Sequence, residues 1–347
     1  MSTDKRAFAE EVRLIADGCG ADRIFLVTDS NVEKIEAGLI ASICPEGITV
    51  IPAGEANKNL REVERVLRML SEHGATRRSI LICVGGGMVT DLGGFAAAIF
   101  KRGIRHINVS TTLLGAVDAA VGGKTGVDFS GLKNEIGAFH LPVAVLADAG
   151  SFATLPPAEI LSGFGEVVKT AMIASGDMTR SILGAAPLEA DRDTLDRICR
   201  FCRDEKMRIV EADPTEKGLR KVLNLGHTAG HAMESMMLER GCGVPHGTAV
   251  AHGLLVGLIL SHMECGLNAA WVSRYAAWLR GNYPLMPFTC ADYERLWELA
   301  RHDKKNVGAD GLDFVLLSAP GEPHIDINTG RRKFESALDI YQELQGR

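Results

Sequence analysis

Residues 80 to 91 read Ile-Leu-Ile-Cys-Val-Gly-Gly-Gly-Met-Val-Thr-Asp, an apolar run that passes straight into three glycines and then into a segment with helical periodicity. This order predicts a buried strand, a glycine turn and a helix, which together bring a pyrophosphate to a helix N-terminus. The match to the dinucleotide pattern G-x-G-x-x-G is imperfect, because Thr90 replaces the third glycine. The stretch predicts an α/β fold, and a purely structural turn explains its glycines equally well.

The first 150 residues repeat this alternation of short apolar runs and helical segments. Runs bounded by Gly, Pro, Asp or Asn predict strands at Ile24–Thr28, Ile48–Ile51, Ile80–Val84, Ile107–Val109 and Val143–Leu146. Helical periodicity marks Arg61–His73 and Leu92–Phe100 between them. The pattern is typical of parallel strands buried between helices.

From Pro156 onward the strand signal fades. Helices are expected at Ala158–Ser175, Asp191–Ala212, Leu223–Leu238, Thr248–Cys265, Trp271–Tyr283 and Ala291–Arg301, with one strand at Asp313–Leu317 after a turn at 304–306. Because 347 residues exceed what one hydrophobic core usually fills, we predict two domains. These are an α/β domain over residues 1–150 and a mostly α-helical domain over residues 151–347.

The composition limits the function classes. A formal net charge of −6 gives no global field for nucleic acid or anionic lipid, so neither is expected as a partner. No apolar stretch is expected to reach the ~18 residues needed to span a bilayer, since the longest, Ala249–Ser261, carries His252 and several glycines. Eight scattered cysteines and the lack of a secretory segment at the start predict reduced thiols and a cytoplasmic protein.

A second glycine loop, Gly122–Gly126, has the Gly-Lys-Thr order of a Walker A motif, but that motif requires a glycine where this chain has Asp118. A P-loop ATPase is therefore excluded. What remains is a set of phosphate or cofactor donors within or just after the exit of the fourth strand: Thr111, Thr112, Lys124, Lys133 and Asn134. Ligands of open α/β sheets gather at the carboxyl ends of strands. Each lysine taken alone is better explained as a solvated surface charge.

Three of only ten histidines gather in one segment, at His227, His231 and His246. If the segment is helical, His227 and His231 share one face, a spacing that lets two imidazoles bind one cation. For an HxxxH spacing alone, two buried and hydrogen-bonded histidines are the plainer explanation. Spacing does not choose the ligands among the three imidazoles, and the H-E-x-x-H motif of metalloproteases is excluded by Thr228.

The ordered motifs together resemble the 3-dehydroquinate synthase family of sugar-phosphate cyclases, from about Asp29 to Gly308. They comprise Gly85–Asp91, Lys101–Gly103, Ser110–Leu114, Val117–Asp118, Gly122–Thr125, Lys133–Asn134, Gly165–Lys169, Leu219–Arg220, Leu223–Thr228, Gly230–His231 and His246–Gly247. The resemblance implies a Rossmann-like, NAD-binding N-terminal domain and a helical C-terminal domain that binds metal and substrate. It also implies a homodimer, and a fold shared with iron-type alcohol and glycerol dehydrogenases.

Carried over residue by residue, the resemblance implies that Glu166, His227 and His246 hold Zn²⁺ or Co²⁺. Two imidazoles and one carboxylate, with open positions left for substrate oxygens, are typical of a catalytic metal site. The implied contacts of a sugar acid phosphate are Arg102 from the partner subunit, Asp118, Lys124, Asn134, Lys169, Lys206, Arg220, Asn224, His231 and either Lys304 or Lys305. The implied contacts of NAD are Asp29, Asn31, Gly54, Glu55, Lys58, Gly86, Gly87, Asp91, Thr111, Thr112, Lys124, Lys133 and Thr154.

The implied activity is that of a carbon–oxygen lyase of the shikimate pathway, which leads to chorismate and the aromatic amino acids. It converts 3-deoxy-D-arabino-heptulosonate 7-phosphate to 3-dehydroquinate and phosphate through transient oxidation by NAD, phosphate elimination, re-reduction and aldol closure. Two departures affect fine geometry: Thr248 stands where the family often has Glu, and Ser110 where proline is common. The alternatives are a sibling cyclase of aminodehydroquinate type and a metal-dependent alcohol or glycerol dehydrogenase.

Overall fold

The computed structural model of the chain describes residues 5–301 and 311–346. Its contacts form two units, Met1–Leu155 with Arg192–Arg203, and Pro156–Asp191 with Asp204–Arg347. These differ from the expected ranges 1–150 and 151–347, mainly because the first part of helix α8 (Arg192–Ala212) packs with the first unit. Helical periodicity carries no information about which unit a helix joins, so no pattern in the sequence indicates that α8 is divided between the two units.

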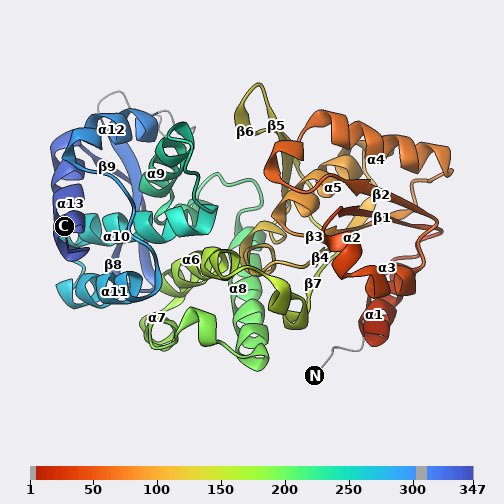
Figure 1. Cartoon of the computed structure of the whole chain (residues 1–347), viewed down its shortest axis with the longest axis horizontal. Coiled ribbons are helices and arrows are strands. Elements are labelled where there is room, and N and C mark those ends of the chain that lie inside the picture. The colour runs from red at the N-terminus through yellow and green to blue at the C-terminus, as the bar shows by residue number, and fades with distance from the viewer. Residues whose placement is uncertain (1–4, 302–310, 347) are drawn as a thin grey trace. The chain divides into compact units, whose positions relative to one another are not determined.

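The first unit is built on a parallel sheet of five strands (Figure 1). The strands are β1 (Ile24–Asp29), β2 (Gly47–Ile51), β3 (Ile80–Gly85), β4 (Arg105–Ser110) and β7 (Ala144–Ala147). Each corresponds to an expected strand, so the α/β prediction is confirmed. The order β2-β1-β3-β4-β7 places the second and third strands on either side of the first. Sheets of this order bind ligands beyond the carboxyl ends of their strands, beside the point where the order reverses.

Helices cover both faces of this sheet. On one face, α4 (Leu60–Glu72) and α5 (Gly87–Ile99) bury Val66 and Leu92 against sheet residues such as Val27 and Cys83. On the other face, the core includes residues of α1 (Lys5–Gly18) and α3 (Ala37–Ile43), while the short α2 (Val32–Ile35) follows β1. The alternating side chains of fully buried strands therefore serve two cores, which is why these strands read as continuous apolar runs.

An antiparallel hairpin of β5 (Lys124–Phe129) and β6 (Leu132–Phe139) completes the first unit, and it was not predicted. Its strands approach closely at Gly126 and Gly137, where a Cβ atom on Gly137 would lie 2.2 Å from the carbonyl oxygen of Thr125. Lys133 and Asn134 lie in β6. The expectation that they fall at the exit of the fourth strand was therefore wrong, because the intervening chain forms a strand of its own.

The second unit is mostly helical, as predicted. It contains α6 (Pro157–Ala174), α7 (Gly176–Leu183), the second part of α8, α9 (His227–Glu239), α10 (His246–Cys265), α11 (Ala269–Asn282), α12 (Tyr293–Arg301) and α13 (Arg331–Leu344). One expected strand is found as β8 (Leu312–Ala319), and it pairs with β9 (Glu322–Thr329), which was not predicted. The last helix, α13, was also not predicted.

Helix α10 forms the centre of the second unit and packs against α6, α9, α11, α13 and β8. By length and composition it could cross a membrane, since it is 20 residues long and an 18-residue stretch of it has a mean hydropathy of 1.3. The longest apolar stretch predicted from the sequence, Ala249–Ser261, was therefore too short. However, 78% of that 18-residue stretch is buried inside the protein, which is typical of the core helix of a globular unit.

Candidate metal and cofactor sites

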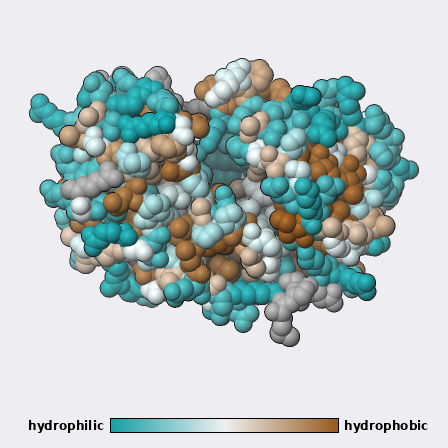
Figure 2. All heavy atoms as spheres, viewed as in Figure 1, coloured by the Kyte–Doolittle hydropathy of each residue, from teal (hydrophilic) through white to brown (hydrophobic). Residues whose placement is uncertain are grey.

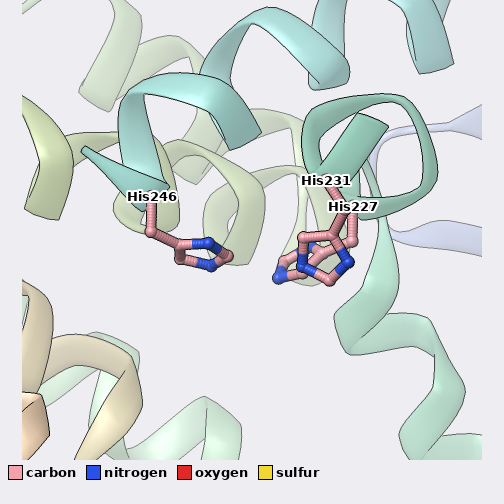
Figure 3. Close-up of side chains that lie close together, drawn as sticks. All are labelled: His227, His231 and His246. Atoms are coloured by element: carbon pink, nitrogen blue, oxygen red, sulfur yellow. The ribbon is translucent and has the colours of Figure 1, made fainter. Parts of the chain in front are cut away.

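Three histidines converge at the starts of two helices of the second unit (Figure 3). His227 is the first residue of α9, His231 lies one turn later, and His246 is the first residue of α10. One ring nitrogen of each lies within 4.8 Å of the other two. The predicted helix is confirmed, and the three imidazoles are close enough to share a single cation.

A buried carboxylate completes this cluster. Glu166, on α6, has no exposed surface, and its Oε1 atom lies 3.5 Å from Nε2 of both His227 and His246. The Lys169 ammonium, one turn further along α6, forms an ion pair with Oε2 of the same carboxylate. Because burying a charge is costly unless it is paired or bound to a metal, a carboxylate beside two imidazoles is a donor set that fits a divalent cation.

The hydrogen bonds of the two imidazoles orient their Nε2 atoms. Nδ1 of His227 lies 3.2 Å from the carbonyl oxygen of Leu225, and Nδ1 of His246 lies 2.9 Å from Oε2 of Glu234. With each Nδ1–H donating, the lone pair of each Nε2 is left for a cation. Burial by itself lowers the pKa of His246, but its contacts with Glu166 and Glu234 raise the pKa to about 9. A cation that binds Nε2 therefore takes the place of a proton there.

Glycines hold the three helices of the cluster at backbone contact. A Cβ atom on Gly165, next to Glu166, would lie 1.9 Å from the carbonyl oxygen of Gly247, next to His246. A Cβ atom on Gly253 of α10 would lie 2.2 Å from the carbonyl oxygen of Gly226, just before His227. Only glycine permits these approaches. The carboxylate and the imidazoles therefore meet because the helices that carry them touch backbone to backbone.

Three cations expected to bind substrate are buried in the same unit. Lys169 and Arg220 are each 1% exposed, and Lys206 on α8 is 8% exposed. Arg220 donates to the carbonyl oxygen of Pro214, and its backbone N–H donates to Asp213. Arg220 and Asn224 lie on a 3₁₀ turn, Leu219–Asn224, that packs against α6. Cations buried in this number suit an anionic ligand.

The expected NAD contacts follow the carboxyl ends of four parallel strands in the first unit. Asp29 is the last residue of β1 and Asn31 follows it, Gly54 to Lys58 follow β2, Gly86 to Asp91 follow β3, and Thr111 and Thr112 follow β4. Gly86 precedes the first residue of α5, so the predicted order of strand, glycine turn and helix is confirmed. Such an edge is where ligands of open α/β sheets bind.

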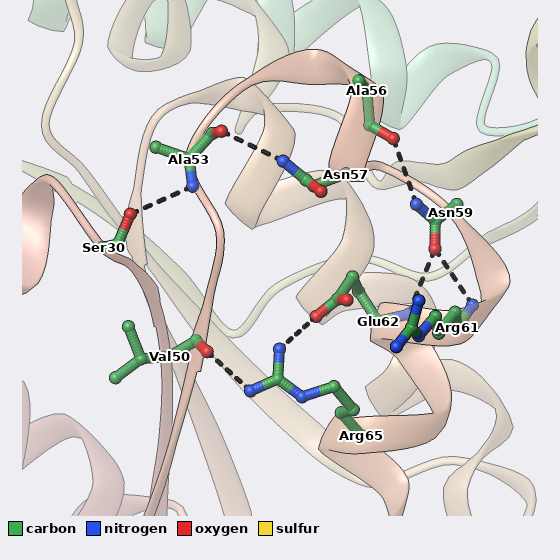
Figure 4. Close-up of polar contacts among 9 residues, drawn as sticks. All are labelled: Ser30, Val50, Ala53, Ala56, Asn57, Asn59, Arg61, Glu62 and Arg65. Carbon is green, nitrogen blue, oxygen red and sulfur yellow. Dashed lines mark hydrogen bonds and ion pairs between the residues drawn. The ribbon is translucent and has the colours of Figure 1, made fainter.

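The loop after β2 carries Gly54, Glu55 and Lys58. Polar contacts among its neighbouring residues shape this loop (Figure 4). The N–H of Ala53 donates to Ser30, and Asn59 caps α4 by accepting from two backbone N–H groups. Lys58 is 4% exposed, and its Nζ lies 2.5 Å from Oδ2 of Asp91. Burial lowers the pKa of Lys58, but the carboxylates of Asp91 and Glu55 outweigh it and raise the pKa above its usual value.

The alternative explanation of the glycine turn at residues 85–87, a purely structural role, is also supported by the packing around it. A Cβ atom on Gly86 would lie 2.9 Å from Cγ2 of Thr112, so the close packing of Thr112 already requires a small residue there. Likewise, Oδ1 of Asp29 accepts hydrogen bonds from the N–H groups of Asn31 and Val32. These residues therefore have structural roles in addition to the expected one.

The remaining candidates are spread over the first unit. Arg102, Lys124, Lys133, Asn134 and Thr154 are exposed, and Asp118 lies half-buried in a π-helical turn, Gly115–Ala119. Lys304 and Lys305 lie outside the described residues. Sequence reasoning missed Glu234 and the glycine contacts. The spacing of His227, His231 and Glu234 could have indicated the former, because they lie on one face of α9.

Comparison with known proteins extends over nearly the whole chain. A family model described as 3-dehydroquinate synthase N-terminal matches residues 48–162, and one described as 3-dehydroquinate synthase C-terminal matches residues 163–306. A protein named 3-dehydroquinate synthase from Parabacteroides distasonis is 41% identical over 94% of this chain and 93% of its own length. One of the same name from Oceanobacillus iheyensis is 37% identical over 92% and 89%.

Solved structures agree with these sequence matches. A 2-deoxy-scyllo-inosose synthase complexed with carbaglucose-6-phosphate, NAD⁺ and Co²⁺ is 26% identical with a TM-score of 0.83, over 95% of this chain and 93% of its own. Its ligands support the expectation of NAD and a divalent cation. A probable glycerol dehydrogenase from Sinorhizobium meliloti shares the fold, with a TM-score of 0.67 and 16% identity over 99% and 95%. The chain belongs to the 3-dehydroquinate synthase family of enzymes.

Proposed function

We propose that this chain converts 3-deoxy-D-arabino-heptulosonate 7-phosphate to 3-dehydroquinate and phosphate. The observation that carries the proposal is the convergence of Glu166, His227 and His246 in a chain that belongs to this family. We propose these three as ligands of Zn²⁺ or Co²⁺, and the residues at the strand ends of the first unit as the NAD site. When bound, the cation polarises a substrate oxygen, and NAD accepts and returns a hydride.

The buried cations of the second unit bind the anionic groups of the substrate. Lys206 and Arg220 suit a phosphate or carboxylate, since charge-assisted hydrogen bonds to these groups are the strong ones. Lys169 is held beside Glu166 by their ion pair, which brings a positive charge next to the reacting carbon atoms. His231 contacts a substrate hydroxyl one helical turn from His227. The burial of Lys169, Lys206 and Arg220 also helps to keep water away from reactive intermediates.

The activity is tested with purified protein, NAD, Zn²⁺ and the heptulosonate phosphate. The expected result is release of inorganic phosphate and formation of 3-dehydroquinate without net accumulation of NADH, because the hydride is returned. Stoichiometric NADH from simple polyols, without phosphate release, would instead indicate the dehydrogenase. A Lys206→Ala variant with full activity would contradict the proposed substrate contacts.

We also propose a cytoplasmic homodimer in which the β5–β6 hairpin lies at the interface. Phe129 and Leu132, which pair at one end of the hairpin, are 47% and 54% exposed, and Phe139 at the other end of β6 is 55% exposed. Figure 2 shows apolar surface over the hairpin. Exposed apolar patches of this kind mark interaction surfaces. The expected contribution of Arg102 to a partner's site is supported by its exposed position and its φ of 68°, since such backbone strain concentrates at functional positions.

Light scattering after size exclusion tests the assembly. Leu132→Glu should convert a dimer to a monomer, because it places a charge in an apolar interface. Leu188→Glu is the matched control, since Leu188 is 55% exposed but lies in the second unit. A wild-type monomer, or a dimer that tolerates Leu132→Glu, would contradict the proposal.

A further inference from the structure

Glu234 lies on the same face of α9 as two of the clustered histidines. His227, His231 and Glu234 occupy positions i, i+4 and i+7 of the helix, so their side chains form one stripe. Oε2 of Glu234 lies 2.9 Å from Nδ1 of His246, and the glutamate side chain is 12% exposed. The carboxylate thus reaches from the middle of α9 to the first residue of α10.

This contact determines which nitrogen of His246 faces the cluster. When Nδ1–H donates to the carboxylate, Nε2 keeps its lone pair and lies 3.5 Å from Oε1 of Glu166. The opposite tautomer would lose the hydrogen bond to Glu234 and would present a proton where a cation must bind. Carboxylates that accept from a ligating imidazole fix its tautomer and orientation and raise its basicity.

The two histidines differ in how firmly packing holds them. The side chain of His227 is 10% exposed and has a backbone carbonyl oxygen as its Nδ1 acceptor, whereas that of His246 is 34% exposed. A side chain with less packing around it depends more on a hydrogen bond for its orientation. The less closely packed imidazole, His246, is therefore the one whose Nδ1–H donates to a charged acceptor, Glu234.

We propose that Glu234 is a positioning residue of the metal site, which acts through His246 and does not bind the cation itself. The inference rests on the proposed ligand set of Glu166, His227 and His246. Helix α9 would then supply one ligand directly, His227, and orient a second, His246, which lies on α10.

Metal affinity of the full chain tests this role, measured by competition with a chromophoric chelator for Zn²⁺ and for Co²⁺. Glu234→Ala should weaken binding by about 10 to 100-fold, the range for lost outer-sphere partners. Glu234→Gln should lose less, because its amide oxygen still accepts from Nδ1–H, and it preserves the test if the alanine variant fails to fold. The absorption spectrum of bound Co²⁺ should change in both variants, since the orientation of a ligand changes.

Glu239→Gln is the matched control, since Glu239 lies on the same helix but pairs with Arg295. It should leave the metal affinity unchanged. In a His246→Ala background, Glu234→Ala should cause no further loss, because its effect passes through that imidazole. An equal loss in both backgrounds would overturn the positioning role, and so would unchanged affinity and Co²⁺ spectrum in the single Glu234 variants. Full metal affinity in His246→Ala alone would instead overturn the ligand set of the proposed function.

Discussion

The two units position their functional residues by different means. In the first unit, most of the candidate NAD contacts lie at or just beyond the carboxyl ends of four parallel strands, and side-chain hydrogen bonds such as those of Ser30 and Asn59 shape the loop after β2. In the second unit, the candidate metal ligands lie on three helices whose glycines touch backbone to backbone. A loop can adjust when a neighbour changes. Helices in backbone contact cannot, so the metal cluster should be the less tolerant of the two sites.

The largest expected effect comes from adding one methyl group between two helices. In Gly247→Ala the new Cβ would lie 1.8 Å from the carbonyl oxygen of Ser162, which is backbone and cannot rotate away. Forced overpacking usually costs 1–3 kcal/mol, and a backbone clash lies at the upper end, so we expect a loss of about 3 kcal/mol or more. Urea unfolding measures this loss, and metal affinity should fall with it because His246 and Glu166 move apart.

Gly281→Ala is the control for that substitution. Gly281 lies in α11, and a Cβ atom there meets no atom within 4 Å. Alanine in a helix is more stable than glycine by about 0.5–1 kcal/mol, so this variant should be slightly more stable than the wild type. If Gly247→Ala were equally harmless, the helices would be free to separate, and the contrast between the two units would fail.

The elements that the sequence predicted are those with an unbroken period. Strand β3 reads as a continuous apolar run because both of its faces are buried. Strand β6 was missed because its side chains are largely exposed, so no apolar alternation marks it. Helix α1 was missed although its buried stripe is regular, because that stripe consists of Ala9, Val12 and Ala16, which are small and lie among charged residues.

The candidate site shows a similar limit. The histidine cluster is visible in the sequence because two of its members lie one helical turn apart. Glu166 lies on another helix and joins them only through the contact of Gly165 with Gly247, which no local pattern indicates. Resemblance to a family indicated this candidate ligand, and the backbone contact of Gly165 with Gly247 explains why it lies beside the histidines.

Each unit also contains a fully buried histidine outside the candidate sites, His106 in the first unit and His252 in the second. His106 of β4 is fully buried, stacks on His140, and has no hydrogen-bond partner for either ring nitrogen among the described residues. His252 of α10 is equally buried, but it contacts the hydroxyl of Tyr341 at 2.7 Å and the carbonyl oxygen of Pro284 at 3.0 Å. Burial lowers the pKa of His106 to about 3 and that of His252 to about 4.

Both histidines should make the fold less stable in acid. Their folded pKa lies below the unfolded value of 6.5, so the contribution is complete above pH 6.5 and is lost as the pH falls toward the folded pKa. Between pH 7 and pH 5 each should cost about 2 kcal/mol, since one pH unit corresponds to about 1.4 kcal/mol per proton. Urea unfolding at both values, with amide exchange to separate the two cores, measures the loss.

Substitution by phenylalanine separates the two cases. His106→Phe should abolish the contribution of His106 to the loss of stability in acid, at little cost in stability at pH 7. The two ring nitrogens that it removes have no hydrogen-bond partner among the described residues, so no group is left unsatisfied. His252→Phe should destabilise the second unit by about 3 kcal/mol at pH 7, because it leaves a hydroxyl and a carbonyl unsatisfied. At pH 5 the difference from the wild type should shrink to about 1 kcal/mol, because the wild type has by then lost about 2 kcal/mol through His252 and the variant has not. If the two variants behaved alike, the hydrogen bonds of His252 would contribute nothing, and the proposed difference between the cores would be wrong.

The smallest effect concerns the glycine turn of the first unit, where a structural and a functional explanation compete. Gly86→Ala would place a Cβ atom 2.9 Å from Cγ2 of Thr112. We expect NAD affinity, measured by calorimetry, to fall about tenfold, because a Cβ there also obstructs the approach of a pyrophosphate to the N-terminus of α5. Thr112→Ser removes the clashing methyl group but keeps the hydroxyl that accepts from the N–H of Gly115. If the glycine serves the cofactor, affinity should stay low when both substitutions are combined, whereas recovery in the double variant would mean that Gly86 is needed only for packing.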